Sequence, residues 1–280
     1  MIVIEFLVIL FFSSIFAGVF GSIVGLGGGV VIVPVLTLLL GVDIHFAIGA
    51  SIVAIIGTSS GAASTYVKDK LTNLRVGMFL ELATTSGAIA GAAIAAYVNS
   101  GALALVFGII LLIALAPTAM KLGEDIPKSP ELKGLSKRLN LKGSYTEPDG
   151  RHIEYNATRP GAGLFGMVVA GMLSGLLGIG SGAFKVLSMD YAMKLPMKVS
   201  TTTSNFMIGV TAAASAGIYY ARGDVNPLIV APVAVGILIG AAIGARLLVK
   251  ARNPTIRKIF AIVLALAAIE MILTSLGVAA

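Results

Sequence analysis

The chain has 280 residues, of which 57% are hydrophobic and only 12% are charged, and its formal net charge is +7. Ordinary soluble domains are about 25% charged, so this composition excludes a water-soluble globular enzyme and a disordered chain. The absence of cysteine and the presence of only two histidines exclude disulfides, thiolate chemistry and a histidine-rich metal cluster. We expect no cofactor, and we attribute the basic excess to loops beside anionic lipid rather than to nucleic-acid binding.

Charged residues are concentrated in residues 121–160, which hold 14 of the 33 charged side chains. We therefore predict a first membrane repeat at 1–120, a charged connector at 121–160 and a second membrane repeat at 161–280. The first apolar stretch is interpreted as a retained membrane helix, because no basic residue precedes it and Glu5 interrupts it. Within the connector, we predict a short helix from Ser129 to about Leu139 and a hairpin over 145–155 around a Pro-Asp-Gly turn.

Each predicted repeat contains five apolar segments. In chain order they are 3–24, 29–41, 44–67, 76–98 and 102–119, followed by 162–177, 182–193, 199–220, 227–249 and 256–277. The second segment of each repeat has only about 12 residues and spans about 18 Å, whereas the hydrocarbon layer is about 30 Å thick. The sequence therefore predicts an all-α polytopic membrane protein in which each of these two segments is a half-helix after a glycine-rich break.

An offset of 153 residues aligns the two halves without a gap over about ninety residues. Identical pairs recur along this alignment, and they include Gly25 with Gly178, Gly27 with Gly180, Gly29 with Gly182, Ser51 with Ser204 and Thr58 with Thr211. If the segments alternate across the membrane, 19 of the 20 Lys and Arg residues lie on one side and only Arg222 on the other. This places the connector in the cytoplasm and both termini outside, and makes the two halves inverted repeats. Such repeats are typical of secondary transporters.

The glycine breaks are the first candidate anion-binding elements. They supply Gly27, Gly28, Gly29, Gly180, Ser181 and Gly182 as candidate binding residues. Each break exposes backbone N–H groups at the start of a half-helix, where the helix dipole contributes about +0.5 charge. Close helix packing is the alternative explanation of such glycines, and we adopt it for Gly87/Gly91 and Gly240/Gly244.

Polar side chains inside the apolar segments complete the candidate site. The hydroxyl and amide candidates are Ser51, Thr202, Thr203, Ser204 and Asn205, although capping and bonding back to helix carbonyls would also explain them. Lys185 follows the second break and would offset anion charge, unless it snorkels to the interface or pairs with Asp190. Glu81 and Glu270 are candidates for carrying a coupling proton, with a structural hydrogen-bonded carboxyl as the alternative.

These motifs resemble the sulfite exporter TauE/SafE family. The resemblance is carried by AGVFGSIVGLGGGVVIVPVL (17–36) and DIHFAIGAS (43–51), and by AGMLSGLLGIGSGAFKVLSMD (170–190) and LPMKVSTTTSN (195–205). It covers nearly the whole chain outside 121–160. The chain departs from the family pattern at Leu187, where the first half has Pro34, and at Ala50, where the pattern has threonine. The first half is therefore expected to contribute less to binding.

The resemblance implies a carrier in the cytoplasmic membrane that exports sulfite or an organosulfonate such as sulfoacetate by alternating access. An anion channel, or a permease for another small anion, is the alternative. A membrane-embedded enzyme has no Ser–His–Asp candidate inside the bilayer, because His45 is predicted at an outer helix end and His152 in the connector. The expected partners are the anion and the lipid bilayer, and a homodimer remains open.

Overall fold

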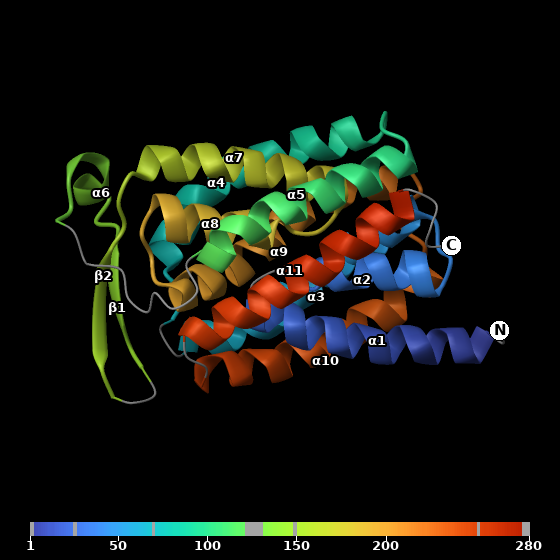
Figure 1. Ribbon diagram of the computed structural model, residues 1–280, viewed down its shortest axis with the longest axis horizontal. Coiled ribbons are helices and arrows are strands. Elements are labelled where there is room, and N and C mark those ends of the chain that lie inside the picture. Colours follow the sequence, from blue (N-terminus) through green and yellow to red (C-terminus); the bar gives the residue numbers. More distant parts are fainter. Residues whose placement is uncertain are drawn as a thin grey trace.

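The computed structural model describes residues 3–24, 27–68, 71–120, 131–147, 150–250 and 253–275. These residues form a helical bundle with a two-stranded hairpin at one end (Figure 1). The first half contains α1 (Val3–Val24), α2 (Gly29–Pro34), α3 (Ile44–Lys68), α4 (Leu74–Ala95) and α5 (Ser100–Met120). The connector contains α6 (Gly134–Arg138), β1 (Lys142–Thr146) and β2 (His152–Asn156). The second half contains α7 (Pro160–Leu177), α8 (Gly182–Leu187), α9 (Met197–Ala221), α10 (Pro227–Lys250) and α11 (Asn253–Ser275).

The prediction of an all-α membrane protein is confirmed. Each of the ten predicted apolar segments coincides with a helix. Among the described residues, four helices are long and apolar enough to cross a membrane: Ile4–Ile23, Leu74–Ala95, Pro160–Leu177 and Pro227–Leu247. Many large apolar side chains on the outside of the bundle are exposed, as lipid-facing residues are.

The second segment of each half is short, as its length predicts. α2 continues into a π-helical turn at Val35–Leu39, and α8 continues into one at Ser188–Ala192. Both helices and both turns keep the 153-residue offset at their first and last residues. In the first half the π turn follows Pro34, whereas in the second half Leu187 stands at that position. The π turn therefore does not depend on the proline.

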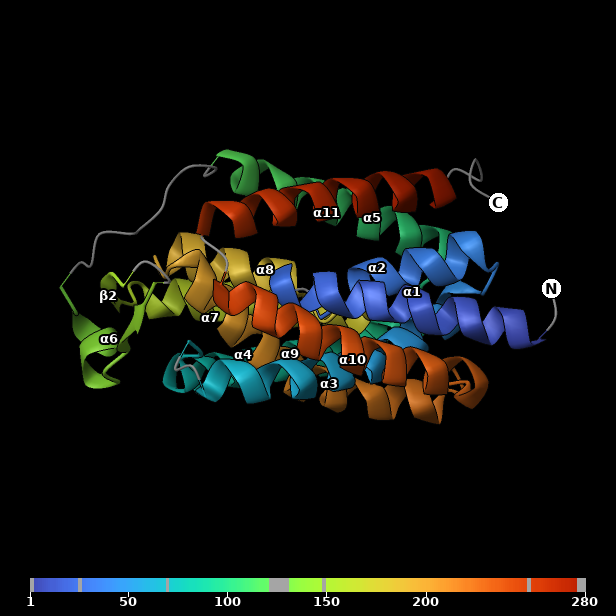
Figure 2. The ribbon, with the colours of Figure 1, turned by 90° about the horizontal axis from the view of Figure 1, so that it is seen from below.

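Glycine stripes allow the long helices to approach closely. α1 packs along α10, and α4 packs along α7. A Cβ atom on Gly87 or Gly91 would overlap backbone carbonyl oxygens of α7, and one on Gly240 or Gly244 would overlap those of α1. The packing interpretation of these four glycines is therefore confirmed. Figure 2 shows α5 and α11 together as a separate layer along one face of the bundle, and these two helices also contact α8 and α2, respectively.

The connector hairpin lies at the end of the bundle opposite the start of α1 (Figure 1). Its two antiparallel strands pair Tyr145 with Ile153, which confirms the predicted hairpin, although residues 148 and 149 of its turn lie outside the described residues. The predicted helix from Ser129 is wrong in extent. Ser129 and Pro130 lie outside the described residues, and α6 begins only at Gly134. The φ of +52° at Gly134 is incompatible with a right-handed helix running through this position from further upstream.

Buried polar contacts hold the hairpin against the ends of α4 and α9. Asn73 caps α4 through its Oδ1, which accepts from Val76 N–H at 3.1 Å, and its Nδ2 donates to the Tyr155 hydroxyl at 3.1 Å. Burial raises the pKa of Tyr155, and the hydrogen bond from Asn73 offsets part of this effect, so the hydroxyl stays neutral. Lys198 Nζ, at the start of α9, lies 3.6 Å from Glu147 Oε2.

The Lys198–Glu147 ion pair is expected to stabilise the docked connector. Both side chains are buried, so removing one charge leaves the other without compensation. Glu147→Gln should lower the free energy of unfolding by about 3 kcal/mol, measured by chemical unfolding of the purified protein in detergent. Glu131→Gln, at an exposed position of the same connector, is the control and should have little effect. Equal stability of the two variants would contradict the assignment.

Candidate functional site

The two glycine breaks meet in the middle of the bundle. α2 lies toward the end where α1 begins, and α8 lies toward the hairpin (Figure 1). A Cβ on either Gly27 or Gly180 would lie 2.9 Å from the same atom, Cγ2 of Ile208, and both glycines also face Ile55. Ile55 and Ile208 are themselves related by the 153-residue offset. The breaks therefore form one central feature, although Gly25 of the first break lies outside the described residues.

Backbone geometry explains why glycine occupies these positions. Gly27 and Gly28 have φ values of +77° and +80°, and Gly180 has +69°, which is the left-handed region that glycine adopts without a Cβ penalty. Ser181 adopts φ +47° as a non-glycine residue. Its hydroxyl is buried and has no hydrogen-bond partner among the described residues. Strained, unpaired groups of this kind concentrate at functional sites.

Side chains of α3 and α9 bind the carbonyl groups that the breaks release. Ser51 Oγ donates to Gly178 O at 2.8 Å, and Thr58 Oγ1 donates to Gly27 O at 3.0 Å. Ser204 Oγ donates to Gly182 O at 3.5 Å, a longer contact, and Asn205 Nδ2 donates to Ser22 O at 2.7 Å. The structure therefore brings the predicted Ser51, Ser204 and Asn205 to the breaks. Their role in this state is to satisfy backbone acceptors.

The start of α8 presents backbone N–H groups to the same region. Gly182 and Ala183 stand in its first turn, where a helix has no acceptor of its own for the N–H groups. Asn205 Oδ1 is buried without a partner among the described residues. The centre of the bundle thus satisfies carbonyl oxygens with side-chain donors and places the start of α8 beside them. A helix start favours an anionic ligand.

The predicted site residues Thr202 and Thr203 do not reach the breaks. Thr202 Oγ1 donates to Leu71 O at 3.0 Å, and Thr203 Oγ1 accepts from Asn73 N–H at 3.0 Å, so both hold the loop before α4. The structure thus places both on another side of α9 than the breaks. With 3.6 residues per turn, the face that carries Ser204 and Ile208 continues to Thr201, not to Thr202.

Thr201 is a site candidate that the sequence analysis missed. Its hydroxyl is buried without a partner among the described residues, as is that of Ser200. The spacing 201, 204, 205 and 208 was visible in the sequence as one helical face, since residues three and four apart are neighbours on a helix. The position of each residue around the helix axis, rather than the run of consecutive polar residues, therefore indicated which side chains face the breaks.

Lys185 is completely buried beside the breaks. Its Nζ donates to Thr211 Oγ1 at 2.5 Å, and Thr211 Oγ1 lies 2.7 Å from Glu81 Oε1. Since none of the lysine side chain is exposed, the snorkelling explanation is wrong, and its hydrogen-bond partner is Thr211 rather than Asp190. Thr211 stands one helical turn from Ile208, which covers both breaks. The lysine charge is therefore placed close to the central feature.

Glu81 belongs to this cluster and is not an interfacial residue. It is 9% exposed, and its Oε1 also accepts from Thr85 Oγ1 at 3.0 Å. Glu270 lies instead at an exposed position of α11. Thr211 was not predicted as a site residue, although its pairing with Thr58 in the repeat was a signal for it.

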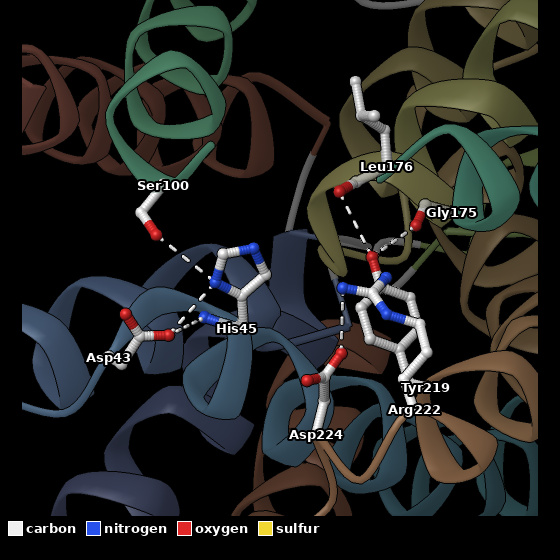
Figure 3. Close-up of polar contacts among 8 residues, drawn as sticks. All are labelled: Asp43, His45, Ser100, Gly175, Leu176, Tyr219, Arg222 and Asp224. Atoms are coloured by element: carbon white, nitrogen blue, oxygen red, sulfur yellow. Dashed lines mark hydrogen bonds and ion pairs between the residues drawn. The ribbon is translucent and has the colours of Figure 1, made fainter. Parts of the chain in front are cut away.

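The end of the bundle opposite the connector hairpin holds the residue types that a Ser–His–Asp triad would need. His45 Nδ1 lies 3.1 Å from Asp43 Oδ1 and 3.2 Å from Ser100 Oγ (Figure 3). Both contacts use the same ring nitrogen, so the imidazole cannot relay a proton from serine to aspartate as a catalytic triad does.

At the same end, Arg222 is the single basic residue predicted outside. It pairs with Asp224 at 3.1 Å and stacks on Tyr219, which donates to Gly175 O at 2.7 Å (Figure 3). Arg222 is thus engaged in structural contacts and is not a free anion-attracting group.

Comparisons with known proteins agree with a transport role. The family model described as "Sulfite exporter TauE/SafE" matches residues 10–271. "Probable membrane transporter protein YunE" of Bacillus subtilis (strain 168) is 30% identical over 272 residues, covering 95% of this chain and 97% of its own length. "Probable membrane transporter protein YdhB" of the same strain is 25% identical over 231 residues, covering 82% and 85%. No solved structure matches the chain.

The break geometry predicts that a side chain at Gly180 disrupts the site. Gly180→Ala would place a Cβ against Ile208 and force a left-handed conformation, which costs about 1–2 kcal/mol. Transport in reconstituted vesicles should fall sharply while the protein still inserts into the membrane. Gly217→Ala is the matched control in α9, because nothing lies within 4 Å of its added Cβ. Wild-type transport by Gly180→Ala would reduce the break to a packing element.

Proposed function

Because the chain belongs to the sulfite exporter TauE/SafE family of membrane transporters, we propose that it exports a small sulfur oxyanion across the cytoplasmic membrane. The family and the names of the relatives describe a membrane transporter and not an enzyme, and the four long apolar helices among the described residues make it a multi-pass protein. The proposed substrate is sulfite or an organosulfonate such as sulfoacetate. The mechanism is alternating access, with the anion bound where the two breaks meet.

The observation that carries this proposal is the buried amino group of Lys185 close to buried hydroxyls that have no partner among the described residues. A charged side chain at membrane depth is costly and generally marks a substrate or ion pathway. Lys185 stands in α8, whose first turn is formed by Gly182 and Ala183. The buried hydroxyls of Ser181 and Thr201 add neutral donors from adjacent segments. A sulfur oxyanion would use these donors in place of the water it loses.

Several features support inverted repeats and a carrier mechanism. The matching bounds of the short helices, and the corresponding pairs α1–α10 and α7–α4, repeat at the 153-residue offset. In Figure 1, α1 runs toward the hairpin end and α7 runs away from it. Ile55 and Ile208 pack over Gly27 and Gly180, which favours an occluding carrier over an open channel. The membrane potential would favour outward movement of an anion by about 2.3 kcal/mol per charge per 100 mV.

Lys185 provides the direct test of the binding site. Lys185→Gln is one bond shorter and keeps some hydrogen bonding but removes the charge, so the affinity for sulfoacetate should fall by roughly 2–3 kcal/mol. Ser204→Ala should cost only about 1 kcal/mol, as the loss of the one neutral hydrogen bond that it donates to Gly182 O at the break. Calorimetry on the purified protein measures both. Lys194→Gln, at an exposed position of the same half, is the control. Equal affinity of wild type and Lys185→Gln would remove Lys185 from the site.

The proposed orientation places the connector in the cytoplasm and both termini outside. It rests on the distribution of Lys and Arg and on the position of the hairpin opposite the start of α1. Because the chain contains no cysteine, a single cysteine reports one position. In intact cells, a membrane-impermeant thiol reagent should label Tyr97→Cys, which is highly exposed after α4, but not Asn140→Cys in the connector. The reverse pattern would contradict the orientation.

A further inference from the structure

Lys185, Thr211 and Glu81 form one continuous polar chain across three helices. The amino group on α8 donates to the hydroxyl on α9, and that hydroxyl lies 2.7 Å from the carboxylate on α4. All three side chains are buried. At the positions related by the 153-residue offset stand Ile32, Thr58 and Ala234, so the repeat does not duplicate the chain. A threonine hydroxyl can accept from the lysine and donate to the carboxylate at the same time.

Among the described residues of the elements packed against it, no other charged side chain is bonded to Glu81. α7 carries no ionisable residue along 160–177, and the nearest basic residue on α4 is Arg75, which bonds to Asn140 O in the connector. On α9, Lys198 pairs with Glu147, and Tyr219 bonds to carbonyls of α7. Asp190, after α8, is buried and has interactions of its own. The charge of Glu81 is therefore balanced by Lys185.

This balance changes when an anion arrives. An oxyanion that draws the amino group toward the break takes away the countercharge of Glu81, and a buried carboxylate without a countercharge is strongly disfavoured. Protonation of Glu81 removes the free-energy cost of this uncompensated buried charge. Glu81 Oε2 is buried and has no hydrogen-bond partner among the described residues, so one oxygen of the carboxylate is open to a proton.

We propose that anion binding at Lys185 is coupled to the uptake of one proton at Glu81, with Thr211 as the residue that couples the two charges. The proposal rests on the export function above and specifies its energetics. One anion and one proton would bind together, so a monoanion would be carried without net charge and a dianion with a charge of −1. Linkage is reciprocal: where Glu81 is ionised in the empty protein, anion affinity should rise up to tenfold per unit fall in pH.

Glu81 is also accessible from the side of the bundle. It lines an apolar groove of about 450 Å³ between α4 and α9, together with Met78, Leu82, Thr85, Ser86, Ile89, Phe206 and Val210. A lipophilic carbodiimide, which modifies protonated carboxyl groups, could enter this groove from the bilayer. Glu270, at an exposed position of α11, provides an internal comparison in the same protein.

The decisive experiment measures proton uptake during binding. Sulfoacetate is titrated into the purified protein by calorimetry above about pH 6, where both of its acid groups stay ionised. Repeating the titration in buffers of different ionisation enthalpy gives the number of protons bound. Wild type should take up close to one proton per anion at the pH where its affinity depends most steeply on pH. Glu81→Gln should take up none, and its affinity should no longer vary with pH.

Two matched controls separate coupling from general damage. Thr211→Val should reduce proton uptake while sulfoacetate still binds, whereas Thr84→Val, whose buried hydroxyl bonds back to Leu80 O on α4, should leave uptake unchanged. Glu270→Gln should behave as wild type. In carbodiimide labelling, sulfoacetate should accelerate modification of Glu81 and not of Glu270.

The outcomes distinguish this proposal from the function on which it rests. If wild type binds sulfoacetate but takes up no proton, or if Glu81→Gln retains the uptake, the coupling is overturned and the export function stands. If neither sulfoacetate nor sulfite binds the wild-type protein, the proposed function fails and the coupling fails with it.

Discussion

An interrupted helix in the middle of a membrane releases backbone N–H and C=O groups where no water is available to bind them. The two glycine breaks create this problem at the centre of the bundle. Hydroxyls of Ser51 and Thr58 bind the released carbonyls of Gly178 and Gly27. The buried hydroxyls of Ser181 and Thr201, by contrast, have no partner among the described residues. These donors favour an anionic guest, and the proposed transport function depends on them.

The two halves share a backbone plan but differ in charge. Each has a short helix after its break and a hydroxyl at the equivalent of Ser51 and Thr58. The buried amine Lys185 belongs to the second half, where the first half has Ile32, and the carboxylate that opposes it, Glu81, belongs to the first half. The two halves therefore contribute opposite charges to one cluster.

The sequence was sufficient for features that depend on local pattern. Helix bounds follow from apolar length, and the packing role of Gly87 and Gly240 follows from their spacing with Gly91 and Gly244. The sequence was insufficient where membership of the site depends on the side of a helix that a residue faces or on its contact with a distant segment. Thr202 lies one residue off the face of Ser204, and Glu81 meets Thr211 130 positions further along the chain. The contact between helices so distant in sequence is fixed by packing, which no local pattern encodes.

The central claim is that both breaks form one anion site that opens to one side of the membrane at a time. Counterflow in vesicles reconstituted with the purified protein tests it most directly. Vesicles loaded with unlabelled sulfoacetate should transiently accumulate labelled sulfoacetate from a trace outside, because each outward-moving carrier returns with labelled anion. The initial rate should saturate with the internal concentration. Uptake that is independent of internal sulfoacetate, and that rises linearly with the external concentration, would contradict the account.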